Sequence, residues 1–256
     1  MTRPIYATAP ATNETTVTID AVAIIPARGG SKRIPRKNVA MVAGLPLIAH
    51  TIRHAQAARL VRDVYVSTDD AQVADIARAY GAHVITRPPE LATDDATSES
   101  ALLNALQQLG AEGREEPEVV VFLQCTSPVR RPHDIDRAIE TLASEGADSV
   151  FSACRVIQWL WREQNGQITS LNFDIAHRPR SQDFPAEFKE NGSIFVFKPW
   201  VLREHQNRLG GRIALYEMDF WSGIEVDSPE ELALCEWILT HIVAGADPAM
   251  RPGSPT

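Results

Sequence analysis

Short apolar runs alternate with amphipathic stretches along most of this chain. Runs rich in β-branched and other apolar residues predict buried strands at residues 21–25, 64–67, 119–124, 149–153 and 193–197. Between them, apolar positions recur at helical spacing and predict helices at residues 45–59, 71–80, 98–109 and 135–144. Pro46 suits a first helical turn, and Gly81 and Gly110 suit helix ends. The alternation predicts an α/β fold in which helices cover both faces of a mainly parallel sheet.

One region breaks this alternation. Residues 155–190 contain Trp159, Trp161 and a turn signal at Asn165-Gly166. We interpret the region as an insertion that returns to the main sheet at Asn191. Two interpretations of the tryptophans stay open, because exposed aromatics on a small hairpin can form a self-association surface or can pack on the parent domain.

Composition narrows the class of protein. The chain has 256 residues, of which 44% are hydrophobic and 23% charged, as is typical of a soluble globular protein. The net charge of −8 argues against a general nucleic-acid binder, which usually has a basic face. No apolar run approaches the roughly 20 residues that cross a bilayer, and the first 20 residues lack a secretory signal core. We therefore expect a cytoplasmic protein without a nucleic-acid or membrane partner.

The first predicted strand opens into a loop with a high density of positive charge. Residues 24–38 read IIPARGGSKRIPRKN and contain five basic residues, Arg28, Lys32, Arg33, Arg36 and Lys37. Loop glycines let backbone N–H groups approach phosphate oxygens, and cations offset the phosphate charge. The loop lacks the Gly-Lys-Ser/Thr of a Walker A loop and the G-x-G-x-x-G of dinucleotide-binding proteins. Its place directly after a core strand favours a phosphate site over a solvated basic loop.

Several further sequence blocks follow in order. They are VSTDD at residues 66–70, RPPELATDDATS at 87–98, LQCTSPVR at 123–130, ENGSIFVF at 190–197 and IEVDSPEEL at 224–232. With PARGGSKRIPRKN, these blocks resemble the signature of the acylneuraminate cytidylyltransferases, also called CMP-sialic acid synthetases, over about residues 20–240. The resemblance implies a three-layer Rossmann-like nucleotidyltransferase fold and a homodimer formed through the inserted segment. It also implies transfer of CMP from CTP to the anomeric hydroxyl of a nine-carbon 2-keto sugar acid.

The resemblance divides the chain into three parts. It predicts a cytidylyltransferase domain over residues 21–244, with 155–190 as the dimerisation insert. Residues 1–20 form the predicted flexible leader, and residues 245–256 the predicted flexible tail.

The resemblance places the CTP phosphates and ribose on the basic loop. It assigns this role to Arg28, Ser31, Lys32, Lys37 and Asn38, with backbone N–H groups of Gly29, Gly30 and Ser31 as a cradle. When the sugar hydroxyl attacks the α-phosphorus, negative charge builds on the phosphoryl oxygens and on the leaving pyrophosphate. We therefore expect Arg28, Lys32 and Lys37 to act in catalysis by positioning and electrostatic stabilisation.

The second nucleotide block begins at Arg87. This residue resembles the family's arginine that reads the cytosine edge, together with Ala96 and Ser98, and a forked donor suits planar acceptors. The alternative is a surface arginine beside a turn. We assign Asp94 and Asp95 to capping the following helix.

Two carboxylates near the C-terminus are the candidates for binding a metal. In an extended segment Glu225 and Asp227 point to the same side, where they can hold one Mg²⁺ with phosphate and water oxygens. The alternative is a helix start, with Ser228 as the cap, Pro229 in the first turn and Glu231 at the third position. Many relatives carry two aspartates here, so Asp227 is the safer metal ligand and the fourth candidate catalytic residue.

The resemblance also suggests contacts to the acceptor sugar. Gln124, at the end of the central strand, and Asn191 match sugar contacts, and Arg130 is expected to face the same cleft. The acceptor's carboxylate calls for a guanidinium partner. Many relatives have an arginine where this chain has Ser181, so either Arg180 replaces it or the acceptor differs from ordinary sialic acid.

The leading hypothesis is a Mg²⁺-dependent cytidylyltransferase that uses CTP to activate a nonulosonic acid for cell-surface polysaccharide biosynthesis. Sialic, legionaminic, pseudaminic and deaminated sialic acids are such nonulosonic acids. Two alternatives stay open: a cytidylyltransferase for an eight-carbon keto sugar acid, and a nucleotide-binding homologue without turnover. The SKRIPRKN form of the loop and the ENG block favour the nine-carbon acceptor.

Overall fold

A computed structural model of the chain describes residues 19–243. Its main sheet has seven strands in the order β11-β7-β10-β6-β1-β4-β5. Their bounds are β1 Ala21–Pro26, β4 Val61–Thr68, β5 His83–Thr86, β6 Val119–Leu123, β7 Ser149–Val156, β10 Glu187–Phe197 and β11 Ile213–Met218. Neighbouring strands are parallel except that β10 is antiparallel to both β6 and β7. The predicted tail at 245–256, and all but residues 19 and 20 of the predicted leader, lie outside the described residues.

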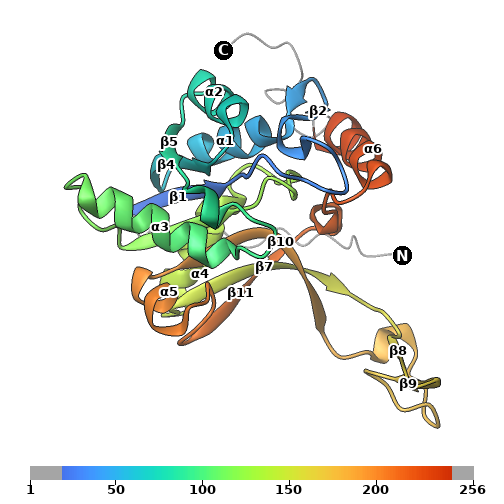
Figure 1. The fold of residues 1–256 in the computed structure, drawn as a ribbon. Helices are drawn as coiled ribbons and strands as arrows, with labels where there is room; N and C mark the ends of the chain where they lie inside the picture. The colour runs from blue at the N-terminus through green and yellow to red at the C-terminus, as the bar shows by residue number, and fades with distance from the viewer. Residues whose placement is uncertain (1–18, 244–256) are drawn as a thin grey trace.

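Helices cover both faces of this sheet (Figure 1). The helices are α1 Leu47–Ala57, α2 Ala71–Ala79, α3 Ser98–Ala111, α4 Asp134–Ser144 and α5 Pro199–His205. One core joins the sheet to α1, α2 and α4, through side chains such as Ile52 and Ile139. The other joins it to α3 and α5, through Leu102 and Leu202. These three layers confirm the predicted Rossmann-like α/β class.

A third core cluster brings the end of the described chain beside residues 34–47. Helix α6 (Pro229–Ile238) and the π-helical turn η5 (Leu239–Val243) pack against the small hairpin of β2 (Met41–Val42) and β3 (Leu45–Pro46). Buried Val42, Val226, Cys235 and Ile238 belong to this cluster. The segment that precedes α6 is thereby held next to the basic loop after β1.

Two predicted helix boundaries differ from the structure. Pro46 is the residue before α1 rather than part of its first turn, because it still pairs with Met41 in the β2–β3 hairpin. Gly110 lies inside the last turn of α3, and the left-handed glycine that follows this helix is Gly113, with φ of 75°. Gly81, with φ of 77°, ends α2 as predicted. None of the helices within residues 19–243 is long and apolar enough to cross a membrane.

The inserted segment contains the predicted hairpin. Strands β8 (Trp161–Gln164) and β9 (Gln167–Ser170) pair antiparallel, and both turn residues, Asn165 and Gly166, have positive φ, as the tightest hairpin turns require. The insertion is shorter than predicted, residues 157–186, because Val156 pairs with Glu187 and so extends both β7 and β10. Figure 1 shows the hairpin well away from the main sheet.

The tryptophans of this insert pack within the insert. Trp159 contacts Phe184 edge-on with ring centroids 5.0 Å apart, and Trp161 contacts Phe173 in the same way at 5.2 Å. The Arg178 guanidinium lies over Trp159 and Phe173. These contacts argue against packing on the parent domain, and Trp161 remains 46% exposed.

Candidate functional site

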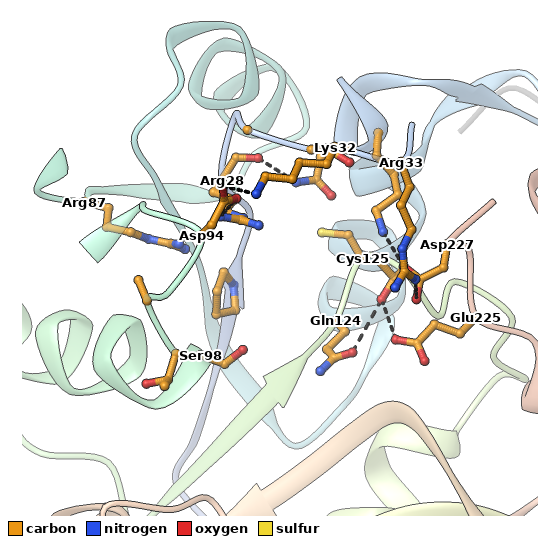
Figure 2. A pocket seen from close by; sticks show the side chains of 18 of the residues that line it. Arg28, Lys32, Arg33, Arg87, Asp94, Ser98, Gln124, Cys125, Glu225 and Asp227 are labelled. Atoms are coloured by element: carbon orange, nitrogen blue, oxygen red, sulfur yellow. Dashed lines mark hydrogen bonds and ion pairs between the residues drawn. The ribbon is translucent and has the colours of Figure 1, made fainter. Parts of the chain in front are cut away.

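A cavity of about 560 Å³ opens at the carboxyl ends of β1 and β6 (Figure 2). The two strands are neighbours, but the chain first goes from β1 to β4 and β5 on one side before it returns to β6 on the other. This reversal is the topological switch point at which open α/β sheets bind their ligands.

Twelve of the predicted site residues line this cavity. They are Arg28, Gly30, Ser31, Lys32, Lys37, Asn38, Arg87, Ala96, Ser98, Gln124, Glu225 and Asp227. Four blocks that are distant in sequence thus meet at one place, as the resemblance implied. The other four predicted residues, Gly29, Arg130, Arg180 and Asn191, lie elsewhere.

The basic loop is held in shape by its own polar groups. Asn38 Nδ2 donates to the carbonyl of Arg28 at 2.9 Å, and the N–H of Gly29 donates to Asp69 Oδ1 at 3.0 Å. A Cβ at Gly29 would lie 2.6 Å from Asp70 Oδ2, so only glycine fits there. Because the Gly29 N–H is already bonded to Asp69, it is not free for a phosphate. Of the three residues expected to cradle the phosphates, Gly30 and Ser31 line the cavity.

One carboxylate joins two cations on the first wall of the cavity. Asp94 accepts from Arg28 Nη1 at 3.0 Å and pairs with Lys32 Nζ at 2.6 Å (Figure 2). The hydrogen bond from Lys32 is the main reason why the pKa of Asp94 is lowered. The prediction that Asp94 and Asp95 cap the next helix is wrong, because Thr97 caps α3 and accepts from the Ser100 N–H.

A second carboxylate joins two cations on the opposite wall. Lys37 Nζ donates to Asp227 Oδ1 at 2.8 Å and to the carbonyl of Val226 at 2.9 Å. Arg33 Nη1 donates to Asp227 Oδ2 at 3.1 Å. Arg33 was not among the predicted site residues, although its position between Lys32 and Lys37 in the basic loop was a usable signal.

The helix-start interpretation of the segment before α6 is confirmed, and the metal-binding role of its carboxylates stays a prediction. Ser228 caps α6, Pro229 begins it, and the Glu231 carboxylate accepts from the backbone N–H of Asp227 at 2.9 Å. The side chains of Glu225 and Asp227 nevertheless face the cavity, although the segment is an extended loop and not a strand of the sheet.

Glu225 lies in a partly desolvated position. Its carboxylate accepts from Thr126 Oγ1 at 3.2 Å, and burial, followed by the charge of Asp227, raises its pKa. Within residues 19–243 no cluster of three or more His, Cys, Asp or Glu side chains is arranged to hold a metal ion. This chain therefore offers a cation two carboxylates, and phosphate and water oxygens would have to complete the coordination.

Arg87 is a buried residue of the cavity wall and not a surface arginine. It is 5% exposed; its Nε donates to Ser67 Oγ at 3.2 Å, and its Nη2 donates to the Ser67 carbonyl at 2.6 Å. Burial lowers its pKa. Its Nη1 has no hydrogen-bond partner among residues 19–243, and the guanidinium points towards Asp94 and Arg28 in Figure 2.

The cavity wall at the end of β6 depends on a close approach by a glycine. Gln124 Oε1 accepts from Thr126 Oγ1 at 3.4 Å. Gly192, with φ of 63°, lies so near that a Cβ would be 2.9 Å from Gln124 Oε1 and 3.4 Å from Glu225 Oε1. Gly192 was not singled out from the sequence, because the Asn-Gly pair is equally typical of a plain turn.

Arg130 does not face the cleft, contrary to the prediction. It is fully buried and donates to Thr51 Oγ1 at 3.1 Å and to the carbonyls of Gln124 and Ser193 at 3.0 and 2.8 Å. Burial lowers its pKa to about 10, so it remains charged at neutral pH. Arg130 therefore ties the end of β6 to β10 beneath the site.

The predicted sugar contact at Asn191 is also corrected. Asn191 is 2% exposed, its Oδ1 accepts from Ser152 Oγ at 2.6 Å, and its Nδ2 donates to the Ser222 carbonyl at 3.1 Å. These bonds direct the amide into the protein, where it fixes the backbone that carries Gly192.

Arg180 lies in the insert and not at the cavity. Its side chain is 73% exposed and its Nε donates to Asp183 Oδ2 at 2.7 Å. A contact between Arg180 and the sugar carboxylate is therefore absent from the site that residues 19–243 of one chain form.

Comparison with known proteins agrees with this geometry. Residues 22–200 match the family described as Cytidylyltransferase. Over 209 residues the chain is 38% identical to N-acylneuraminate cytidylyltransferase A of Danio rerio, covering 80% of this chain and 47% of that protein. Over 220 residues it is 32% identical to the N-acylneuraminate cytidylyltransferase of Streptococcus agalactiae serotype III, covering 82% and 51%. The chain spans about half the length of the curated relatives it matches.

Solved structures share the fold at low sequence identity. CMP:2-keto-3-deoxy-manno-octonic acid synthetase, complexed with CTP, superposes with a TM-score of 0.65 at 22% identity, covering 86% of this chain and 98% of that one. For 4-diphosphocytidyl-2C-methyl-D-erythritol synthase the TM-score is 0.64 at 17% identity, with coverage of 88% and 100%. Fold and cavity together define an α/β protein of the nucleotidyltransferase class. The chain belongs to the cytidylyltransferase family, and its resemblance to the acylneuraminate branch is confirmed by the relatives.

Proposed function

We propose that this chain transfers CMP from CTP to the anomeric hydroxyl of a nonulosonic acid and releases pyrophosphate. The observation that supports this most strongly is the meeting of four sequence blocks in one cavity. The basic loop, the Arg87 wall, Gln124 and the Glu225–Asp227 pair all face the same space. The proposal places the reaction in the cytoplasm, where nucleoside triphosphates are abundant, as the step that activates the sugar acid for cell-surface polysaccharide biosynthesis.

The two walls of cations suit a triphosphate. Arg28 and Lys32 lie on one side, and Arg33 and Lys37 on the other. These groups are already directed at the cavity by their ion pairs, so little reorganisation is needed when charge builds on the leaving pyrophosphate. A bound triphosphate would take the place of the Asp94 carboxylate beside Arg28 and Lys32.

The Arg87 wall suits a pyrimidine base. The Nη1 donor of Arg87 can serve acceptor atoms of the base edge, and backbone groups of Ala96 to Ser98 can serve the remaining edge. Gln124 and the space in front of Gly192 lie between this wall and the carboxylates. We place the acceptor sugar there, with its hydroxyl directed at the α-phosphorus.

The residues present fit a Mg²⁺ ion. Glu225 and Asp227 would hold it, because two oxygen ligands with phosphate and water oxygens satisfy this hard cation, and a cation offsets the burial of Glu225. When bound, Mg²⁺ neutralises charge on the phosphoryl oxygens. Lys37 Nζ, at 2.8 Å from Asp227 Oδ1, orients that carboxylate.

We further propose a homodimer formed through the insert. Of the eleven large hydrophobic residues that are exposed within residues 19–243, six belong to the insert: Ile157, Leu160, Trp161, Ile168, Leu171 and Ile175. Such a concentration is typical of an interaction surface. A role for Arg180 with the sugar carboxylate would then depend on the second copy.

The test is pyrophosphate release from CTP with Mg²⁺ across a panel of nine-carbon and eight-carbon 2-keto sugar acids, with ATP, GTP and UTP as controls. We expect release with CTP and a nine-carbon acid, and a rate at least about 100-fold lower for Lys37→Ala. Release with only the eight-carbon acid would replace the acceptor assignment. CTP binding without any release would instead identify a non-catalytic nucleotide-binding protein.

A further inference from the structure

Arg208 connects helix α3 with strands β6 and β10, next to the cavity wall to which the nucleobase is assigned. It lies in the loop after α5, and its Nε donates to Glu99 Oε1 at 2.7 Å. Both partners are largely buried, with side chains 19% and 15% exposed. Most other ion pairs within residues 19–243 have at least one partner that is more than a third exposed, so this pair is unusually shielded.

The Arg208 guanidinium also lies on two aromatic rings. Its Cζ is 4.8 Å from the ring centroids of both Phe122 and Phe195. These rings are partners across β6 and β10, and they stack with centroids 5.4 Å apart. Phe122 itself lines the cavity. The planar guanidinium is thus fixed both by its ion pair with Glu99 and by its contact with the two phenylalanine rings.

The other end of the ion pair belongs to the first turn of α3. Glu99 follows Ser98, the first residue of the helix, and Thr97 is the cap. The three residues before Glu99, Ala96 to Ser98, all line the cavity. A displacement of this turn would therefore displace the segment to which the nucleobase is assigned.

We propose that Arg208 is a positioning residue that fixes Ala96–Ser98 through Glu99 and so contributes to selection of the cytosine base. This inference rests on the proposed function. Base selection depends on donors and acceptors placed to within tenths of an ångström, and misplacement by about 1 Å can cost up to about 100-fold. A lysine cannot reproduce the planar contact with both rings.

A purely structural role is the competing explanation. A largely buried ion pair often contributes little net stability compared with an apolar pair of the same shape. A structural role would lower the melting temperature without changing the choice between nucleotides. A positioning role changes nucleotide affinity and selectivity in the folded protein, even where the melting temperature is unchanged.

The test compares Arg208→Leu and Arg208→Lys with the unmodified chain, by calorimetric binding of CTP and UTP without acceptor and by KM values for each substrate. We expect Arg208→Leu to bind CTP about tenfold more weakly, with a smaller ratio of CTP to UTP affinity and an unchanged KM for the sugar. Arg208→Lys should restore part of the affinity, since it keeps the charge but loses the stacking. The matched control is Arg203→Leu on α5, whose ion pair with Glu116 is half exposed.

Two results would overturn the inference. One is a folded Arg208→Leu protein with wild-type CTP affinity and selectivity, even if it melts earlier. The other is an equal loss in the Arg203→Leu control. Absence of CTP binding by the unmodified chain would overturn the proposed function as well, which separates the two failures.

Discussion

Single residues decide how the cavity is charged before a nucleotide enters. Four of the five cations that line it pair with a carboxylate: Arg28 and Lys32 with Asp94, and Arg33 and Lys37 with Asp227. The carboxylates have different surroundings. Asp227 also belongs to the segment that leads into α6, whereas Asp94 lies on a loop and, in the proposed complex, would give way to the triphosphate.

This difference predicts the effect of Asp94→Asn. The substitution removes a negative charge that competes with the triphosphate for Arg28 and Lys32. CTP should therefore bind roughly threefold to tenfold more tightly. Calorimetric titration with CTP at low ionic strength measures this. Asp95→Asn is the control, since Asp95 forms no ion pair within residues 19–243. Weaker binding by Asp94→Asn would show that Asp94 orients the cations instead of competing for them.

The residue types of the site could largely be predicted from the sequence, but side-chain directions could not. The basic loop, Arg87, Gln124 and Asp227 were all predicted and all line the cavity. Arg130 and Asn191 belong to the right sequence blocks, but both side chains point away from the cleft. The reason is physical: a buried polar side chain turns to the hydrogen-bond partners that other strands bring, and these are not adjacent in the sequence.

At the scale of elements, the long helices and the buried strands were predictable, and the shortest helix and the partly exposed edge strands were not. Strands β1, β4, β6 and β7 and helices α1 to α4 appear where the patterns placed them. The edge strands β5 and β11 and the seven-residue helix α5 were missed. Strand β5 and helix α5 are too short to show clear periodicity, and β11 is largely unburied, so it lacks a continuous apolar run. The antiparallel direction of β10 follows from the connection through the insert, which no local pattern reveals.

Helix α1 makes stability depend on pH. His50 and His54 lie on its buried face; burial lowers the pKa of His50 and holds that of His54 well below the ordinary 6.5. The positive charges of Arg53 and Arg130 also lower the pKa of both histidines, and His50 lowers the pKa of His54. Because the unfolded chain takes up these protons first, stability is complete above about pH 6.5 and falls as the pH drops below it.

Each of these histidines should cost about 1.4 kcal/mol of unfolding free energy per pH unit below 6.5, until its folded pKa is reached. Urea unfolding at pH 7.5 and pH 5.5 measures the loss. His54→Leu should reduce the dependence on pH, because it removes one of the two histidines whose pKa is lowered by burial. Ile52→Val, which removes no titratable group from the same buried face, should leave it unchanged. Equal dependence in both variants would contradict this account.

At the scale of the whole molecule, the body and the insert expose different surfaces. The body buries its apolar residues in three clusters, while the insert projects from the sheet and exposes six large hydrophobic side chains (Figure 1). The division into a body and an insert was predictable, because the break in alternation marks it. The homodimer that the resemblance implies through this surface stays a prediction, since one chain does not contain the partner.

The proposed homodimer makes a direct prediction about mass. Light scattering coupled to gel filtration should give twice the 28.2 kDa of one chain. Trp161→Glu combined with Ile168→Glu should give the single-chain mass, because charges at a buried interface are costly. Phe220→Glu is the control, a residue 76% exposed on the body. A monomeric unmodified chain, or dissociation by Phe220→Glu alone, would contradict a dimer through the insert.

The central claim is that the chain transfers CMP from CTP, and phosphorus NMR of the reaction mixture tests it most directly. The full chain is incubated with CTP, Mg²⁺ and the acceptor that releases pyrophosphate. We predict that the CTP signals give way to pyrophosphate and one new phosphodiester signal in equal amounts, and only when the acceptor is present. Formation of CDP and inorganic phosphate would contradict the claim, because it would place the attack at the γ-phosphorus.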